Sequence, residues 1–223
     1  MIKVVKVSNK DEGQEKAHEI LKKLIHQSTL LALSGGTTPN YKKMLIDPGD
    51  ILPGAICVVD ERFGEPFHGN SNELLLKEAG IKKWADDNCI ESHKILRGKD
   101  ASQTGGEYDA VIADLFKRFK KRVGVMGIGT NLHTAGIFPN SEAGKSADWV
   151  VSEIVQDRFP QRITMTLKAL GEFSAFIILV FGKEKAAAIK KLMDPKENDM
   201  QKYPAIFYRK SKIRTYLVTD IDA

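Results

Sequence analysis

Cysteine is scarce in this 223-residue chain, which contains only Cys57 and Cys89. These two residues do not form the close pair that a zinc motif uses, and nothing else indicates an oxidising compartment. No segment approaches the roughly 20 apolar residues that a membrane-spanning helix needs. The N-terminal residues also lack the long apolar stretch and the small-residue cleavage site of a secretory signal. We therefore expect a cytoplasmic protein with no metal, no cofactor and no membrane partner.

Strong charge of one sign is absent too. The chain has 34 lysines and arginines against 29 acidic residues, which gives a formal net charge of +5. The basic residues are scattered, and no arginine-rich arm or basic-aromatic platform typical of nucleic-acid binding stands out. A few focused cations can serve a small anionic ligand equally well. The charge alone favours acidic partners without choosing among them. For the sequence as a whole we expect a small anionic ligand and no nucleic acid, and a monomer or a homodimer is left open.

Apolar runs of strand type alternate with amphipathic runs of helix type along the whole chain. The strand-like runs cover residues 2–7, 29–34, 55–60, 123–129, 148–155, 173–182 and 213–220. The helix-like runs cover residues 11–27, 72–80, 106–119 and 183–193. This alternation predicts an α/β fold of one domain, residues 1–223, with a largely parallel central sheet flanked by helices as in a Rossmann-like sandwich. Residues 80–105 are the least regular, and we expect a small excursion there.

Three unusual loops follow predicted strands, where α/β folds collect their ligands. The first is "SGGTTPN", in which Gly35 and Gly36 allow the backbone to approach a ligand closely. Thr38 is expected to cap a helix with Pro39 at its first position. Free amides and a helix dipole would then form a phosphate cradle. An ordinary glycine-containing turn remains the alternative interpretation.

The second loop, "DERFGEPFHGNSN", begins at the end of the run 55–60. For Asp60 and Glu61 we favour a structural role, as partners of a neighbouring arginine. Arg62 lies where a ligand is expected, and its fixed positive charge could face developing negative charge. Ser71 or Asn72 is expected to cap the helix that follows.

The third loop, "GIGTNLHTAGIFP" at 127–139, surrounds His133 with glycines, so backbone amides could line a pocket beside an imidazole that moves protons near neutral pH. His18, His26 and His93 lie in helical or polar stretches and are interpreted as ordinary surface or core residues, whereas His68 is left open. Further along, Arg162 begins an alternating run. Lys183 and Lys185 lie in the first turn of a helix, where a bound anion would explain their positive charge.

Taken together, "SGGTTP", "DERF…SN", "GIGTNLHTAGIFP", "PQRITMTL" and "FGKEKA" resemble, in order and approximate spacing, the motifs of 6-phosphogluconolactonases. That family shares its α/β fold with the glucosamine-6-phosphate deaminases, and the resemblance covers about residues 30–190. "HTAGIFP" and the segments of Arg62 and Arg162 favour the lactonase branch. The deaminase branch has an acidic residue a few positions after the histidine, where this chain has Ile137, Phe138 and Pro139.

The resemblance implies a role for each matching position. The backbone of Gly35, Gly36 and Thr37 would hold the substrate phosphate together with Arg162 and Lys185, which the family spacing prefers over Lys183. His133 would be the general base that activates water, and Arg62 would stabilise the oxyanion or orient the lactone. The implied reaction is metal-independent hydrolysis of 6-phospho-D-glucono-1,5-lactone to 6-phospho-D-gluconate in the oxidative pentose phosphate pathway.

The chain departs from the family beside the histidine, where Asn131 and Leu132 replace the usual Asp-Gly. Asn131 can accept a hydrogen bond from the imidazole through its amide oxygen, or it can turn its NH2 group toward the ring and favour the wrong tautomer. Leu132 adds bulk and a stiffer backbone. Three hypotheses follow: a lactonase with a variant base, a deaminase or isomerase of amino-sugar phosphates, and a weakly active sugar-phosphate-binding relative.

Overall fold

The computed structural model describes residues 2–222. Its main sheet has seven parallel strands in the order β1-β10-β9-β6-β2-β3-β5. These strands are β1 (Ile2–Lys6), β2 (Thr29–Leu33), β3 (Ala55–Val58), β5 (Glu91–His93), β6 (Lys121–Met126), β9 (Ala175–Val180) and β10 (Arg214–Thr219). The predicted parallel α/β fold is therefore confirmed. Strands β2 and β9 are buried along their whole length and are apolar apart from Thr29, as expected where both faces of a parallel sheet are covered.

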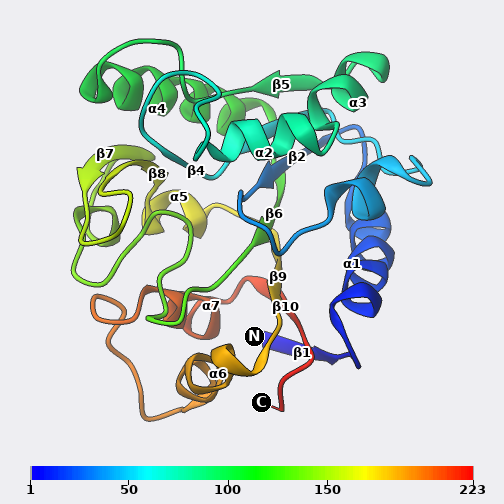
Figure 1. The fold of residues 1–223 in the computed structure, drawn as a ribbon, viewed down its shortest axis with the longest axis vertical. Helices are drawn as coiled ribbons and strands as arrows, with labels where there is room; N and C mark the ends of the chain where they lie inside the picture. The colour runs from blue at the N-terminus through cyan, green and yellow to red at the C-terminus, as the bar shows by residue number, and fades with distance from the viewer. Residues whose placement is uncertain (1, 223) are drawn as a thin grey trace.

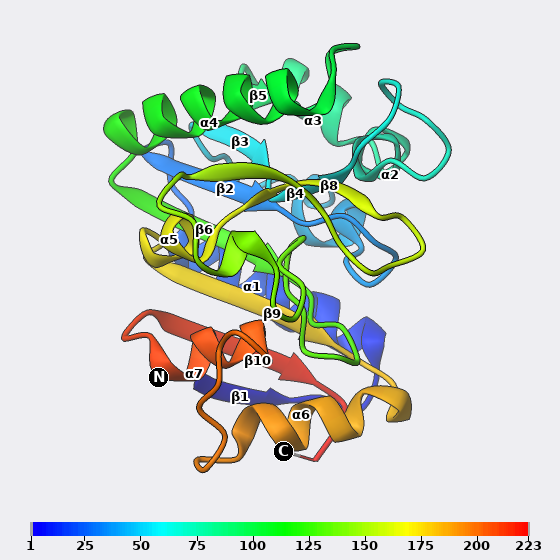
Figure 2. The same ribbon diagram turned by 90° about the vertical axis from the view of Figure 1, so that its left-hand side faces the viewer.

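Helices and a second sheet cover the two faces. The helices are α1 (Lys10–Leu24), α2 (Asn72–Glu78), α3 (Ile81–Asp87), α4 (Ala101–Arg118), α5 (Leu167–Gly171), α6 (Ala186–Met193) and α7 (Phe207–Lys210). Short helical turns are η1 (Lys42–Ile46), η2 (Glu142–Gly144), η3 (Lys183–Lys185) and η4 (Pro204–Ile206). In Figures 1 and 2, α1 lies on one face of the main sheet, and α5 and the second sheet lie on the other.

The second sheet was not predicted. It is antiparallel, with the order β4-β8-β7, and consists of β4 (Asp60–Arg62), β7 (Val150–Ile154) and β8 (Gln161–Met165). The predicted strand 55–60 divides between the two sheets, because the chain leaves β3 at Val58 and enters β4 at Asp60. This change of sheet brings Arg62 opposite Arg162. Figure 2 shows the small sheet in front of the main one.

Two local predictions were wrong, one about residues 80–105 and one about Thr38. Residues 80–105 are not an irregular excursion, since they contain α3, the edge strand β5 and the start of α4 at Ala101. Thr38 does not cap a helix, because residues 35–40 form a loop and helical structure begins only with the turn η1. Asn40 does the capping, through its Oδ1, which accepts from the amide of Lys43 at 3.1 Å.

Helix α1 holds this loop in place. Asn9 caps this helix, and Gln14, a buried residue of the helix, faces the loop of residues 35–40. The Gln14 side chain donates to the carbonyl of Thr38 at 3.0 Å and accepts from the amide of Asn40 at 2.9 Å. One buried amide therefore fixes both sides of the Pro39 bend. Among residues 2–222, no helix is long and apolar enough to cross a membrane.

Candidate active site

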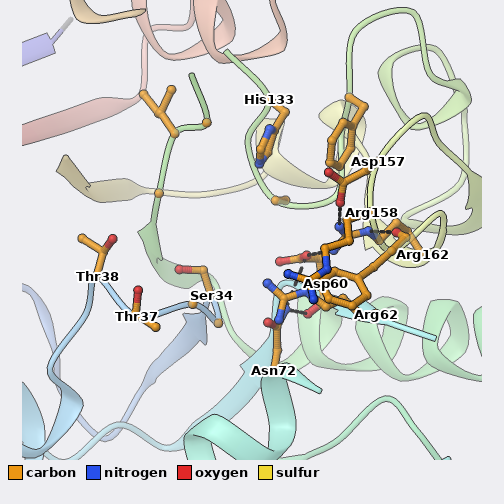
Figure 3. Close-up of a pocket in the computed structure, with 18 of the residues that line it drawn as sticks. Ser34, Thr37, Thr38, Asp60, Arg62, Asn72, His133, Asp157, Arg158 and Arg162 are labelled. Carbon is orange, nitrogen blue, oxygen red and sulfur yellow. Dashed lines mark hydrogen bonds and ion pairs between the residues drawn. The ribbon is translucent and has the colours of Figure 1, made fainter. Parts of the chain in front are cut away.

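A cavity of about 460 Å³ lies at the carboxyl ends of β2, β6 and β9, beside β4 and β8. The chain runs from β2 to β3 in one direction across the sheet and from β6 to β9 in the other, so the cavity sits where the winding reverses. Figure 3 shows its lining, which comes from all three of the loops singled out in the sequence. Segments more than a hundred residues apart therefore meet at one site.

The loop after β2 forms one wall. Gly35, Gly36, Thr37 and Thr38 line the cavity, and their backbone amides donate to no other residue in the described range 2–222. Gly36 has a φ of +87°, which glycine adopts without strain. At Gly35 a Cβ would lie 2.0 Å from Oδ1 of Asn72, so only glycine fits. Four amide donors are thus available to an anion without the helix dipole that the sequence suggested.

His133 lies across the cavity from this loop, and Figure 3 shows its ring pointing into the space between them. The Oδ1 atom of Asn131 is 3.1 Å from the backbone nitrogen of His133 and 2.6 Å from Nδ1 of its ring. A backbone N–H can only donate, so the atom of Asn131 that faces it must be the amide oxygen. The same oxygen then requires Nδ1 to carry the proton, which leaves the lone pair on Nε2. Of the two orientations that the sequence left open for Asn131, the structure has the one in which the amide oxygen faces the imidazole.

The surroundings of the imidazole keep it neutral. Burial, with a smaller contribution from the positive charges of Lys185 and Arg162, lowers the pKa of His133 to about 4, and the negative charge of Asp157 only partly opposes this shift. The ring also stacks on Phe138 with 4.4 Å between centroids. At neutral pH the histidine is therefore an unprotonated imidazole, ready to accept a proton at Nε2.

A close approach of the backbone makes room for that ring. At Gly129 a Cβ would lie 2.2 Å from both Cε1 and Nδ1 of His133. Leu132, between Asn131 and His133, has a φ of +64° and a buried side chain. Its left-handed backbone is the conformation that glycine adopts most readily, and the leucine accepts it while its side chain packs in the core.

The small sheet supplies the arginines. Arg62 and Arg162 are directly opposite one another on β4 and β8, so both side chains extend from the same face. Like charges in that position repel, and carboxylates compensate them: Nη2 of Arg162 donates to Asp157, and its Nη1 lies 4.0 Å from Asp60. Arg162 is only 5% exposed, and it retains donors that its carboxylate partner does not use. The cavity wall therefore carries two fixed guanidinium groups, of which Arg162 is buried and Arg62 half-buried.

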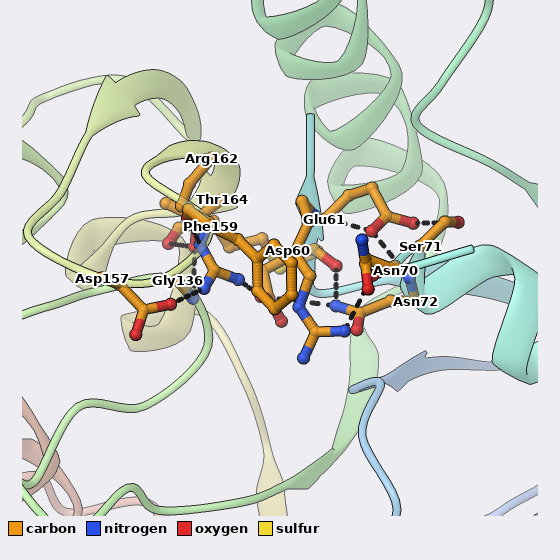
Figure 4. A network of polar contacts seen from close by, with 12 residues as sticks. Asp60, Glu61, Asn70, Ser71, Asn72, Gly136, Asp157, Phe159, Arg162 and Thr164 are labelled. Atoms are coloured by element: carbon orange, nitrogen blue, oxygen red, sulfur yellow. Dashed lines mark hydrogen bonds and ion pairs between the residues drawn. The ribbon is translucent and has the colours of Figure 1, made fainter. Parts of the chain in front are cut away.

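Arg62 is held by the loop that follows it. Its Nη1 donates to the carbonyl of Asn70 at 2.8 Å, and its guanidinium lies 5.1 Å from the Phe159 ring centroid. Its Nε is buried and has no partner among residues 2–222. Figure 4 shows this corner, with Asp60 between Asn72 on one side and Arg162 on the other.

The expected roles of the acidic pair separate in the structure. Glu61 is structural as predicted, but its partners are not arginine side chains: it accepts from the amides of Arg62, Asn72 and Glu73 and from the hydroxyl of Ser71. Asp60, for which we favoured a structural role, lines the cavity. The pKa of Asp60 is raised on balance, because the effect of burial exceeds the opposing effect of the positive charges of Arg162 and Arg62.

The two alternatives for the helix cap are also resolved. Ser71 caps α2, because its hydroxyl accepts from the amide of Leu74 at 3.1 Å. Asn72 instead lines the cavity and donates to the carbonyl of Asp60 at 2.9 Å.

Of the two candidate lysines, Lys185 lines the cavity, and its Nζ donates to the carbonyl of Ile128 at 3.0 Å. Lys183 is exposed and does not line the cavity.

Comparison with known proteins identifies the family. The model of the family Glucosamine-6-phosphate isomerases/6-phosphogluconolactonase matches residues 9–217. The chain belongs to this family. Its resemblance to 6-phosphogluconolactonases, inferred from five motifs, is thereby confirmed at the level of the family.

Two curated relatives of the family represent its two branches. A 6-phosphogluconolactonase from Nostoc sp. is 29% identical over 188 residues, which cover 79% of this chain and 76% of the relative. A glucosamine-6-phosphate deaminase from Streptococcus uberis is 26% identical over 210 residues, which cover 86% of each chain. These two relatives therefore represent the lactonase and the deaminase branches of the family.

Solved structures of family members share the fold. The 6-phosphogluconolactonase from Thermotoga maritima superposes with a TM-score of 0.79 at 22% identity, covering 98% of both chains. The 6-phosphogluconolactonase from Plasmodium vivax has a TM-score of 0.81 at 20% identity, covering all of this chain and 90% of the other.

Sequence reasoning missed several residues of the cavity. They are Ser34, Asp157, Arg158, Phe159 and Phe138 as a ring beside the histidine. The segment 156–160 follows the predicted strand 148–155, but it carries no glycine pattern that marks it, and it connects the paired strands β7 and β8 beside the site. Among residues 2–222, no three histidine, cysteine or acidic side chains are grouped as metal ligands would be.

Proposed function

We propose that this protein hydrolyses 6-phospho-D-glucono-1,5-lactone to 6-phospho-D-gluconate, with His133 as the general base and without a metal. One observation carries the proposal: Asn131 fixes the proton of the imidazole on Nδ1, so the lone pair of Nε2 is free at a cavity lined by cations. The 6-phosphogluconolactonases among its relatives support the same reaction.

The phosphate would bind to the amides of residues 35–37, with Lys185 and Arg162 as counter-charges. Positively charged and hydrogen-bonding groups on several elements converge there, as anion sites require. A bound phosphate would also offset the two cations that lower the pKa of His133. Substrate binding would therefore raise the basicity of the imidazole at the moment when it is needed.

The reaction then needs one proton carrier. Nε2 of His133 takes a proton from water as the water oxygen bonds to the lactone carbonyl carbon, and Arg62 stabilises the oxyanion that forms. The bond from that carbon to the ring oxygen then breaks, and the proton on Nε2 passes to the departing oxygen. The product is the open-chain acid, and His133 returns to its neutral state.

A deaminase activity receives less support from the site. Phe138 stacks on the imidazole of His133 and Ile137 is buried, so the positions shortly after the histidine present apolar side chains and no carboxylate. Ammonia release from glucosamine 6-phosphate would nevertheless show that the substrate differs from the one proposed.

The deciding experiment is an initial-rate assay on freshly generated lactone, corrected for spontaneous hydrolysis. His133→Ala should reduce the enzymatic rate by at least about 100-fold, whereas His26→Ala, far from the cavity, should leave it unchanged. Full activity after EDTA treatment is expected for a reaction without a metal. Equal rates for wild type and His133→Ala would remove His133 as the base. Saturable 6-phosphogluconate binding without any turnover would instead favour a sugar-phosphate-binding protein.

A further inference from the structure

A second cavity, of about 420 Å³, lies away from the catalytic one, between the helices α2 and α3 and the strands β2, β3 and β5. Its volume is within the range of small-molecule sites. Its inner wall is apolar and buried, formed by Leu33, Ile56, Cys57, Val58, Leu76 and Ile81. None of these side chains lines the catalytic cavity. A flat apolar group would fit against this wall.

One buried polar side chain, that of Glu73, interrupts the apolar wall, and Lys82, Ser92 and His93, which are not buried, also line the cavity. Glu73 is only 4% exposed, and its Oε1 accepts hydrogen bonds from the amides of Ile95 and Leu96. Its Oε2 is buried and has no partner among residues 2–222. Buried carboxylate oxygens are normally paired, since an unpaired one loses its hydration without compensation. Oε2 therefore offers an acceptor to a ligand that brings a hydrogen-bond donor into an apolar space.

The mouth of the cavity has the opposite character. Phe67 is 36% exposed there and has a φ of +60°, an uncommon backbone conformation for an aromatic residue. The ammonium groups of Lys77 and Lys94 lie 4.8 and 5.2 Å from the centroid of its ring. Within the described residues, neither lysine has a carboxylate within 4.0 Å. An anionic group at the mouth would meet two cations without ion-pair partners.

We propose that this second cavity binds a purine nucleotide. Its base would lie on the apolar wall with an exocyclic amine donating to Oε2 of Glu73, and its phosphate would lie at the mouth beside Lys77 and Lys94. The partly exposed ring of Phe67, beside both ammonium groups, would contact the sugar between the base and the phosphate. The buried acceptor and the apolar wall match the base, the ring of Phe67 matches the sugar, and the cationic mouth matches the phosphate, in the order in which these parts are joined.

Isothermal titration calorimetry with AMP and with GMP tests this assignment on the full chain. We expect saturable binding of at least one of them. Glu73→Gln keeps an oxygen for the amides of Ile95 and Leu96 but presents NH2 to the ligand, and it should weaken binding about tenfold, equivalent to about 1.4 kcal/mol. The double variant Lys77→Ala/Lys94→Ala should weaken binding by a similar factor, and ribose 5-phosphate, which lacks the base, should not bind in the same range.

Two controls make the result specific. Lys83→Ala removes an exposed lysine of α3 that pairs with Asp87 outside the cavity, and it should leave nucleotide affinity unchanged. Arg158→Ala removes a cation from the catalytic cavity and should also leave affinity unchanged. Absence of binding for both nucleotides at millimolar concentration would overturn the proposal. So would binding that is lost in Arg158→Ala but kept in Glu73→Gln, and neither result bears on lactone hydrolysis.

Discussion

The amide oxygen of Asn131 lies 2.6 Å from Nδ1 of His133 while it also accepts the backbone N–H of the same histidine. An asparagine can therefore orient the imidazole as an aspartate would, and it keeps the Nε2 lone pair toward the cavity. What it cannot supply is negative charge, which would stabilise the imidazolium that forms when the base takes a proton.

Asn131→Asp should restore that charge. We expect the pKa of His133 to rise and the rate of lactone hydrolysis at neutral pH to increase by about tenfold, because a stronger base moves closer to the working pH. The measurement is the corrected initial rate at saturating lactone, with the histidine pKa followed by NMR. Asn131→Ala should do the reverse, since Nδ1 loses its acceptor and both tautomers become available. A rate for Asn131→Ala equal to wild type would show that this hydrogen bond does not matter.

Leu132→Gly should not bring a comparable gain. The substitution relieves the left-handed backbone at φ +64°, worth about 1–2 kcal/mol, but it empties a buried leucine position, which costs about 3 kcal/mol or more. We expect the free energy of unfolding to fall by about 1–2 kcal/mol on balance and the rate to stay within about twofold. Urea denaturation and the lactone assay measure the two effects. A variant more stable than wild type would mean that backbone strain dominates at this position.

Gly129→Ala tests the space reserved for the imidazole. The added methyl would lie 2.2 Å from two atoms of the His133 ring, so the ring must move. A displacement of about 1 Å at a catalytic group costs on the order of 100-fold in rate. Gly106→Ala, on the α4 helix, adds the same methyl in open space and should leave the rate unchanged. Similar rates for the two variants would place the productive position of the ring elsewhere.

Lys185→Met tests the electrostatic control of the base. Lys185 disfavours the imidazolium, so its removal should raise the pKa of His133 from about 4 toward its usual range. Since the neutral imidazole is the active form, the acid limb of the kcat profile should move to higher pH, and 6-phosphogluconate should bind more weakly. NMR titration of the histidine gives the pKa directly. The neighbouring Lys183→Met, outside the cavity, should change neither quantity, and an unchanged pKa in Lys185→Met would contradict the proposed control.

The sequence predicted most strands of the main sheet because they are short, largely apolar runs, such as residues 29–33 and 175–180. Such runs can be recognised as buried strands without knowing which strands pair with them. It also placed Gly35, Arg62, His133 and Lys185 at one cavity, since loops at the carboxyl ends of parallel strands must converge.

The small sheet and what it carries were not predictable in the same way. Its pairing of Asp60–Arg62 with residues 161–165 joins segments a hundred residues apart, and nothing local distinguishes β4 from the continuation of β3. Asp157 and Arg158 lie on the connection between β7 and β8, so they reach the site through the small sheet as a whole. The cap expected at Thr38 failed for a similar reason, because Gln14 of α1 fixes the loop in a conformation that delays helical structure to η1.

Glu61 gives a final test, of structure instead of catalysis. Its two carboxylate oxygens accept four hydrogen bonds, three of them from backbone amides at the start of α2 and in β4. In Glu61→Gln one oxygen becomes an NH2 group, which must face donors, so the free energy of unfolding should fall by about 2–4 kcal/mol. Glu65→Gln, at an exposed position in the same loop, should change it by less than about 0.5 kcal/mol. Because Glu61 positions both Arg62 and Asn72 through their amides, the folded fraction of Glu61→Gln should also show a lower rate on the lactone. A fully stable Glu61→Gln protein would mean that the loop is held by other contacts.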